Sequence, residues 1–268
     1  MHFDPSRKDS LDINADNFTL TINKTVIKQV TETKFLGVII DNKLSWSPHI
    51  KQLTTKLRSC TGRLYGIKNL IPKHLHKDIY HTLFESHLVY GISVWGGVSQ
   101  NKLKPLFTAQ KKCIRIMFGD NEAYIDKFKT CVRVRPYGSQ ILGSEFYRKE
   151  STKPLFVSND ILTVHNLYSY YCILQTYKIL KLRTPISLYS LFNRSQRKET
   201  LLLTPSRSSN FTYMSSYLWN KYRQSSAIYD FTVTICTLKH SLKNFLLMAQ
   251  KKYDTDEWCD ENLDVFSN

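Results

Sequence analysis

A long apolar stripe in residues 48–72 constrains the fold of this chain more than any other feature. Its members are spaced alternately three and four residues apart, which is the pattern of one face of an α-helix. They are Ile50, Leu53, Leu57, Cys60, Leu64, Ile67 and Ile71. A helix with one apolar face buries it against other elements, so the stripe predicts a bundle of helices. Pro72 ends this helix or starts the next element.

Similar spacing predicts further helices along the chain. The second stripe comprises Leu75, Ile79, Leu83 and His87, and the third comprises Leu103, Leu106, Gln110, Cys113 and Met117, ending near Gly119. Helical spacing returns over 161–180, and we expect two more helices over 213–222 and 234–253. Residues 119–150 lose this periodicity and contain several Gly, Pro and Arg residues, so they predict a connecting loop.

The start of the chain favours a small antiparallel β element. Phe18, Leu20 and Ile22 alternate with polar residues, and Asn23-Lys24 supplies a turn before a return strand around Val26 and Ile27. Residues 35–40 then predict a third strand, largely buried, with Gly37 inside it. A glycine within a strand indicates a bulge or a close approach of backbone.

These elements predict a mainly α protein with a small N-terminal antiparallel β element, a helical bundle and a helical C-terminal domain. The expected divisions are 1–17 as a polar linker, 18–45 as the β element, 46–120 as a basic helical domain, 121–150 as the connecting loop, 151–253 as the C-terminal domain and 254–268 as an acidic tail. No apolar run reaches the ~18 residues of a membrane span, so we expect no membrane insertion.

Motifs for catalysis and metal binding are absent from the sequence. The six cysteines are scattered and none forms Cys-x-x-Cys, so neither a disulfide framework nor a zinc site is predicted. The sequence has no P-loop, Gly-x-Ser-x-Gly or His-Glu-x-x-His motif. His74 and His76 are two residues apart, which places them on different sides of a helix as surface or packing residues. We therefore expect no catalytic residue, no metal ligand and no cofactor.

The charge of the chain points to a polyanionic partner. The net charge is +16, and because the tail from Asp254 onward holds six acids and no base, residues 1–253 carry +22. The excess is concentrated in residues 46–118, which contain twelve bases and two acids. A body this basic attracts nucleic acid, and a soluble, merely well-charged surface is the alternative.

The first predicted helix carries five bases and no acid. Helices exposed to water usually mix charges to gain i,i+4 pairs, so this run of like charges suggests compensation by phosphates. The predicted nucleic-acid-binding residues are Lys51, Lys56, Arg58, Arg63 and Lys68 on the first helix and Lys111, Lys112 and Arg115 on the third. No base-reading element is recognisable, so we expect contacts that tolerate any sequence.

Several motifs together resemble the reverse transcriptases of LINE-type, non-LTR retrotransposons, the jockey-like elements especially. The resemblance runs over about residues 18–250 and is carried by Lys34-Phe35-Leu36-Gly37-Val38-Ile39-Ile40, Leu44-Ser45-Trp46-Ser47-Pro48-His49-Ile50, Tyr90-Gly91-Ile92-Ser93-Val94-Trp95-Gly96, the segment from Leu106 to Ile116, Lys153-Pro154-Leu155-Phe156 and Tyr217-Leu218-Trp219-Asn220. It implies that Phe35, Leu36 and Gly37 resemble the primer grip that positions a primer's 3′ end. It also implies that the helices after Trp46 resemble the thumb, which holds the template–primer duplex.

The resemblance implies a truncated reverse-transcriptase fragment without the catalytic palm. Its Tyr-x-Asp-Asp motif does not occur here, so the Mg²⁺ ions of the family would belong to the missing palm, and we expect no polymerase activity from this chain alone. The implied partners are RNA or an RNA–DNA duplex, and the implied location is intracellular, in the nucleus. A domesticated nucleic-acid-binding protein and a protein-interaction module with an incidentally basic surface are the alternatives. The sequence leaves the oligomeric state open.

Overall fold

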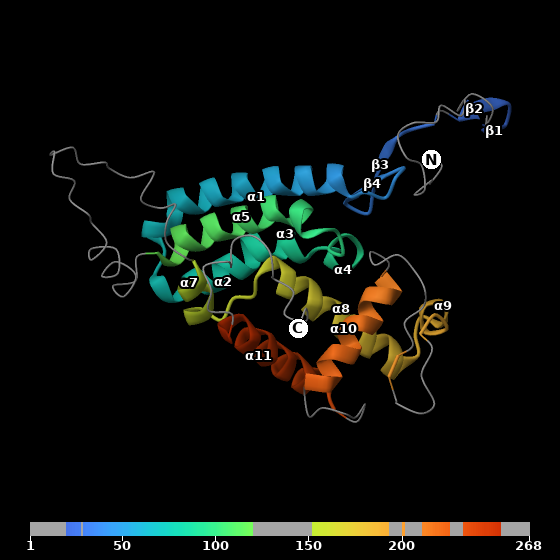
Figure 1. Ribbon diagram of the computed structural model, residues 1–268. Helices are drawn as coiled ribbons and strands as arrows, with labels where there is room; N and C mark the ends of the chain where they lie inside the picture. The colour runs from blue at the N-terminus through green and yellow to red at the C-terminus, as the bar shows by residue number, and fades with distance from the viewer. Residues whose placement is uncertain are drawn as a thin grey trace.

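The protein is mainly helical, with two small antiparallel strand pairs at its start, so the predicted fold class is confirmed (Figure 1). The computed structural model describes residues 20–27, 29–119, 152–192, 200–201, 211–225 and 233–252. The predicted linker, connecting loop and acidic tail lie outside these residues, as does Phe18. The domain boundaries therefore stay predictions.

The elements are as follows. The strands are β1 (Leu20–Ile22), β2 (Thr25–Ile27), β3 (Glu32–Phe35) and β4 (Val38–Asp41). The longer helices are α1 (Ser47–Ile67), α5 (Gln100–Phe118), α7 (Lys153–Ser158), α8 (Val164–Leu182), α10 (Phe211–Ser225) and α11 (Ile235–Lys252). The short helical segments are η2 (Lys68–Leu70), η3 (Lys73–Leu75), α2 (His76–Ile79), the π-helix η4 (Tyr80–Glu85), α3 (Ser86–Val89), α4 (Ile92–Trp95) and α9 (Ile186–Tyr189).

The β region consists of two separate hairpins. The first pairs Leu20 with Ile27 and turns at Asn23-Lys24, as the sequence predicts. The single buried strand predicted over 35–40 is wrong, because the chain reverses at Leu36-Gly37 and pairs β3 with β4. Both turn residues have a positive φ, 45° and 83°, which suits the two-residue turn of a twisted hairpin. Phe35 and Leu36 are 60% and 74% exposed at its tip.

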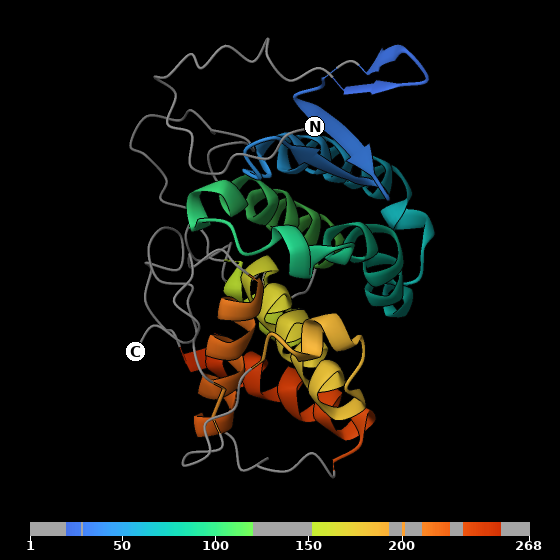
Figure 2. The same cartoon turned by 90° about the vertical axis from the view of Figure 1, so that its right-hand side faces the viewer.

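Helix α1 buries the predicted stripe against α5. Ile50, Leu53, Leu57, Cys60 and Leu64 are buried, whereas Ile67 is exposed and Ile71 lies beyond the helix. The predicted third helix is confirmed as α5, whose expected stripe is buried along its whole length. Figures 1 and 2 show α1, α5 and α3 on one side of the molecule and α8, α10 and α11 on the other.

The predicted second stripe is wrong by one residue. Leu75 and Leu83 are 38% and 47% exposed, and the buried residues of this region are His76, Tyr80, Phe84 and Leu88. In an α-helix, residues four apart differ by about 400° around the axis, so each step of four moves the side chain about 40° around the helix. The wider turn of the π-helix offsets this rotation. The rings of Tyr80 and Phe84 stack with centroids 5.5 Å apart. Because aromatic side chains bury more apolar area than leucine, they decide which side faces the core.

His76 is a packing residue, one of the two roles expected for it, and it joins three segments of backbone. Its Nδ1 lies 2.8 Å from the Met117 carbonyl oxygen, and its Nε2 lies 3.1 Å from that of Lys68 and 3.2 Å from that of Ile71. The ring therefore ties the end of α5 to the connection that follows α1.

Helices α8, α10 and α11 form the second half of the core. All three were expected from the sequence, and α8 is buried on most of its surface. The ring of Trp219 on α10 lies 6.0 Å from that of Tyr177 on α8, and Tyr222 lies 5.4 Å from Phe245 on α11. Cys60, Cys113 and Cys172 are buried free thiols, while the free thiol of Cys236 is exposed.

Two buried glutamines hold the segment that leads into α8, and the first of them joins the two halves. Gln110 on α5 donates to Tyr80 Oη at 3.0 Å and to the Leu162 carbonyl at 2.9 Å, and its Oε1 accepts from the Val164 amide at 2.9 Å. Gln250 on α11 holds the same segment, accepting from Asn166 Nδ2 at 3.0 Å and donating to the Ile161 carbonyl at 3.1 Å. The connection into α8 thus has its backbone polar groups paired by side chains from two other helices.

Replacing Gln110 by leucine should lower the free energy of unfolding. Gln110→Leu leaves the Leu162 carbonyl and the Val164 amide buried without these partners, which costs about 2–4 kcal/mol. Urea unfolding monitored by circular dichroism measures the loss. The matched control is Gln175→Leu, on the exposed face of α8, which should change stability by less than about 0.5 kcal/mol. Equal losses in the two variants would contradict this role for Gln110.

Candidate nucleic-acid interface

The β3–β4 hairpin is joined to α1 by a turn that Asp41 stabilises. The Asp41 carboxylate accepts hydrogen bonds from the backbone amides of Ser45 at 3.0 Å and Trp46 at 2.9 Å. Burial raises the pKa of this carboxyl, but the hydrogen bonds from Ser45 and Trp46 lower it more, so the pKa lies below its ordinary value. Lys102 on α5 donates to the Ser45 carbonyl at 2.9 Å and fixes the same turn from the other side.

The tip of the hairpin rests on the end of α3. The Tyr90 hydroxyl donates to the Leu36 carbonyl at 2.7 Å. A Cβ at Gly37 would lie 3.3 Å from Tyr90 Cε1, and φ there is +83°, so glycine suits this position on both counts. Closer to α1, the Ile39 amide donates to His49 Nδ1 at 3.4 Å. The predicted primer-grip-like residues therefore sit on a hairpin fixed to the helices.

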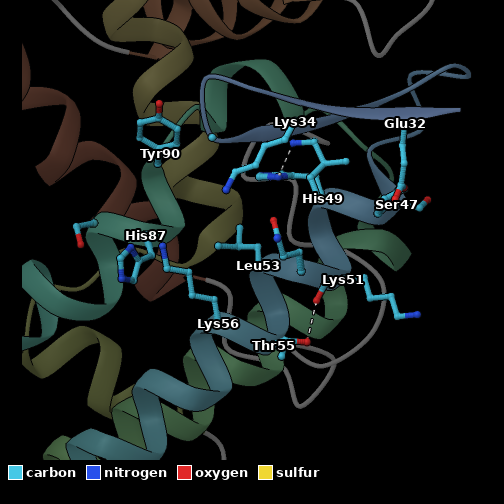
Figure 3. Close-up of a pocket in the computed structure, with 15 residues that line it drawn as sticks. Glu32, Lys34, Ser47, His49, Lys51, Leu53, Thr55, Lys56, His87 and Tyr90 are labelled. Carbon is cyan, nitrogen blue, oxygen red and sulfur yellow. Dashed lines mark hydrogen bonds between the residues drawn. The ribbon is translucent and has the colours of Figure 1, made fainter. Parts of the chain in front are cut away.

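An open cleft of about 1230 Å³ lies between the hairpin, the first half of α1 and α3 (Figure 3). Its basic side chains are Lys34 on β3, Lys51 and Lys56 on α1, and His87 on α3. Glu32 is the acid among the residues that line it. The cleft thus brings two predicted binding residues of α1 together with the hairpin that carries the predicted primer grip.

The cleft contains two histidines whose pKa values are lowered. Burial lowers the pKa of His49, whose Nε2 has no hydrogen-bond partner within the described part of the chain. Burial also lowers the pKa of His87, and the positive charges of Lys56 and Arg63 lower it further. The electrostatic field at His87 is therefore positive.

Helix α1 carries its bases in two rows rather than on one face. Lys51 and Arg58 form the first row and Lys56 and Arg63 the second; the members of each row are seven residues apart. At 100° per residue, the two rows lie about 140° apart around the helix. All four side chains are exposed, and α1 contains no acidic residue.

Four small residues and Gln52 lie between the two rows. This small-residue ridge consists of Thr55, Ser59, Gly62 and Gly66, all of them exposed. A Cβ added at Gly62 or Gly66 would meet nothing within 4 Å, so the helix backbone is open to solvent there. A ligand can therefore approach the axis of α1 closely between two lines of positive charge.

The other predicted binding residues are not among those that line the cleft. Lys68 lies in η2, beyond the end of α1, and is half-buried. Lys111 Nζ lies 4.5 Å from the centroid of the Phe107 ring, which packs against Phe156 of α7 at 6.1 Å. Lys111 thus lies on the side of α5 that faces the second half of the core. Lys112 is exposed on α5, and Arg115 is half-buried in its last turn.

Sequence reasoning missed four residues of the cleft. Lys34 lies on β3, His49 on α1, and His87 and Tyr90 on α3 and just after it, and these three elements meet at the cleft. A weak signal was available for His87, because a polar Ser86-His87 pair interrupts the apolar spacing. Within the described ranges no group of three or more His, Cys, Asp or Glu side chains is placed to hold a metal ion. The helices described are all too short or too polar to cross a lipid bilayer.

Comparisons with known proteins support the resemblance read from the motifs. The chain is 25% identical over 101 residues to a probable RNA-directed DNA polymerase from transposon X-element of Drosophila melanogaster. It is 25% identical over 103 residues to the RNA-directed DNA polymerase from mobile element jockey of Drosophila melanogaster, and 28% identical over 103 residues to that of Drosophila funebris. Each match covers 37% of this chain.

The similarity to RNA-directed DNA polymerases of non-LTR retrotransposons is thus confirmed over that share of the chain. The matched segment spans 11% of the length of each relative. No protein-family model matches the chain. No solved structure matches it.

Because of Asp41, the turn that joins the β3–β4 hairpin to α1 should lose stability in acid. The lowered pKa of Asp41 means that its stabilisation is complete above the ordinary pKa of 3.8 and is lost as the pH falls through the lower value in the folded state. Asp41→Asn should cost about 1–2 kcal/mol near neutral pH, and the difference from wild type should shrink at about pH 3. Urea unfolding at both pH values measures it, with the exposed Asp78→Asn as control. A pH-independent difference would contradict the assignment.

Proposed function

We propose that this chain binds RNA or an RNA–DNA duplex through α1 and the adjoining hairpin, as the thumb-like part of a reverse transcriptase. The observation that carries the proposal is the arrangement of α1: two basic rows on either side of the small-residue ridge, with no acid on the helix. The similarity to RNA-directed DNA polymerases supports nucleic acid as the polyanion.

The spacing of the rows suits a duplex better than a single strand. An α-helix with its side chains is about 10–12 Å across, so rows on opposite flanks can each reach one of two backbones. A-form duplexes present a wide, shallow minor groove with 2′-hydroxyl groups. The small side chains of the ridge permit close approach to such a groove, and the hydroxyls of Thr55 and Ser59 can bond sugar hydroxyls there.

Sequence-tolerant binding follows from the chemistry of the ridge. Bases are read by long side chains such as Arg, Asn and Gln that reach base edges in a groove. The ridge offers glycine and short hydroxyls, with Gln52 as the long amide side chain beside it, and the flanking charged side chains can reach phosphates. We therefore expect affinity to depend on backbone form and salt rather than on base sequence.

The hairpin tip is the second part of the proposed site. Phe35 and Leu36 are exposed beside the cleft, and Gly37 holds the turn against Tyr90. In this position the tip can contact the end of a strand whose phosphates lie along α1, which is the role that the resemblance implies for these residues. Nuclear location belongs to the same proposal.

The proposal is for binding and does not include nucleotide addition. A polymerase needs carboxylates that hold two metal ions. Among the described acids, Asp41 holds a backbone turn, Glu85 lies 3.1 Å from His81, and Asp160 lies 3.4 Å from Lys77. That the chain alone does not polymerise stays a prediction.

A protein-interaction role is the rival with an observation in its favour. The first hairpin exposes apolar side chains, with Ile22 at 62% and Val26 at 59%. Exposed apolar strands pair readily with other chains. Such a role would make the charges of α1 incidental, and its binding would then be insensitive to salt.

Charge reversal of each row separates these functions. Lys51→Glu with Arg58→Glu, and Lys56→Glu with Arg63→Glu, should each weaken binding of an RNA–DNA hybrid about ten- to hundredfold and reduce the slope of log K against log salt by about 2. For a single-stranded RNA of equal length, only one of the two double variants should weaken binding, because a single strand has one phosphate backbone and contacts one row. Fluorescence anisotropy over a salt series measures both slopes.

The matched control reverses two exposed lysines far from the cleft. Lys239→Glu with Lys251→Glu on α11 changes the net charge equally and should leave the salt slope unchanged. If this control weakens binding as much as the row variants, the attraction is a general charge effect and α1 is not the interface. If the wild-type chain binds the hybrid without salt dependence, the proposed function is wrong.

A further inference from the structure

His87 lies on the wall of the cleft and has no role in the duplex contacts proposed above. It is half-buried on α3, and Figure 3 shows its ring beside the Lys56 side chain. Its sequence position suggested a core residue at the end of an apolar stripe. The structure instead exposes one side of the imidazole to the cleft, where a bound phosphate would lie.

Packing of α1 against η4 brings Lys56 and Arg63 close to His87. The Cys60 thiol donates to the Leu83 carbonyl at 3.3 Å and sets the two elements against one another. Lys56 lies one helical turn before Cys60, and Arg63 lies nearly one turn after it. His87 lies one turn beyond Leu83, so it meets the second basic row of α1.

The charges that face His87 are mostly positive. From α1 they are Lys56 and Arg63, which lower its pKa after the larger effect of burial. The other charged and titratable groups that line the cleft are Lys34 and Glu32 on β3, His49 and Lys51 on α1, and Tyr90.

Glu85, the acidic residue at the end of the π-helix, does not face His87. Glu85 pairs with His81 and raises the pKa values of Tyr170 and Tyr171 on α8, although burial contributes most to both shifts. It therefore lies toward the second half of the core, and no acid compensates the positive charges around His87 from its own element.

We infer that His87 takes up a proton when a phosphodiester group binds against Lys56 and Arg63, so that nucleic-acid binding is coupled to pH. This inference rests on the proposed function. In the free protein, partial burial and the positive charges of Lys56 and Arg63 disfavour the imidazolium and lower the pKa of His87. A bound phosphate supplies negative charge at the same place, and the imidazolium then adds a charge-assisted hydrogen bond to it.

Linkage fixes the sign of the effect. A group that holds its proton more tightly in the complex makes the complex more stable at low pH, and one proton changes Kd by at most tenfold per pH unit. We expect the full chain to bind an RNA–DNA hybrid about three- to tenfold more tightly at about pH 6 than at about pH 7.5, at constant ionic strength.

Substitutions at His87 test the coupling. His87→Asn cannot take up the proton, so it should bind at all pH values as weakly as wild type does at high pH. His87→Lys carries a constant charge, and it should bind at high pH as tightly as wild type does at low pH. His74→Asn, an exposed histidine outside the cleft, is the control and should keep the wild-type dependence. A wild-type pH dependence that persists in both His87 variants overturns the inference.

A direct titration avoids reliance on variants that fail to fold. The NMR shift of the His87 ring Cε1–H in the wild-type chain reports its protonation, with and without the hybrid. Its midpoint should move to higher pH in the complex, and an unmoved midpoint overturns the inference. Salt-dependent binding without pH dependence rejects the inference and leaves the proposed function intact. Binding that ignores salt rejects both.

Discussion

The arrangement of the helices depends on the pairing of buried backbone groups by two glutamine side chains. Gln110 and Gln250 are 0% and 2% exposed and serve the short segment that leads into α8. In a dry interior each unpaired amide or carbonyl would be costly, so these bonds specify how α5 and α11 meet that segment. Helix α1 packs on α5, and its basic rows therefore take their orientation relative to the C-terminal helices from this contact.

The helices that can be recognised from their own apolar face were predictable. The stripes of α1 and α5, and the helices α8, α10 and α11, have apolar spacing strong enough to read from the sequence alone. Even Gln110 was placed on the buried face of α5, because its position in the spacing mattered more than its polarity. The first hairpin was predictable because Asn23-Lys24 is a turn signal between alternating residues.

The errors share a physical cause, which is local backbone geometry that apolar spacing does not encode. The run from Phe35 to Ile40 looks continuous, but a positive φ at Leu36 and Gly37 folds it into a hairpin. The buried residues His76, Tyr80, Phe84 and Leu88 are shifted by one from the predicted stripe, and the π-helix keeps the last two in line with Tyr80. The candidate site inherits both effects. Its bases on α1 were predictable, whereas Lys34 is placed by the hairpin reversal, and His87 and Tyr90 follow the π-helix.

The wide turn at Tyr80–Glu85 acts as one extra residue accommodated within a helix. Such an insertion rotates everything after it by about 100° relative to everything before it. Tyr80 precedes most of this rotation, and Leu88, His87 and Tyr90 follow it, so a single irregularity sets the phase of the core and of the cleft together. A chain in which this stretch were shortened by one residue would rotate Leu88, His87 and Tyr90 together relative to Tyr80, so the buried residue and the cleft residues would lose their positions at once. The segment is therefore a point where length, and not only side-chain chemistry, is under constraint.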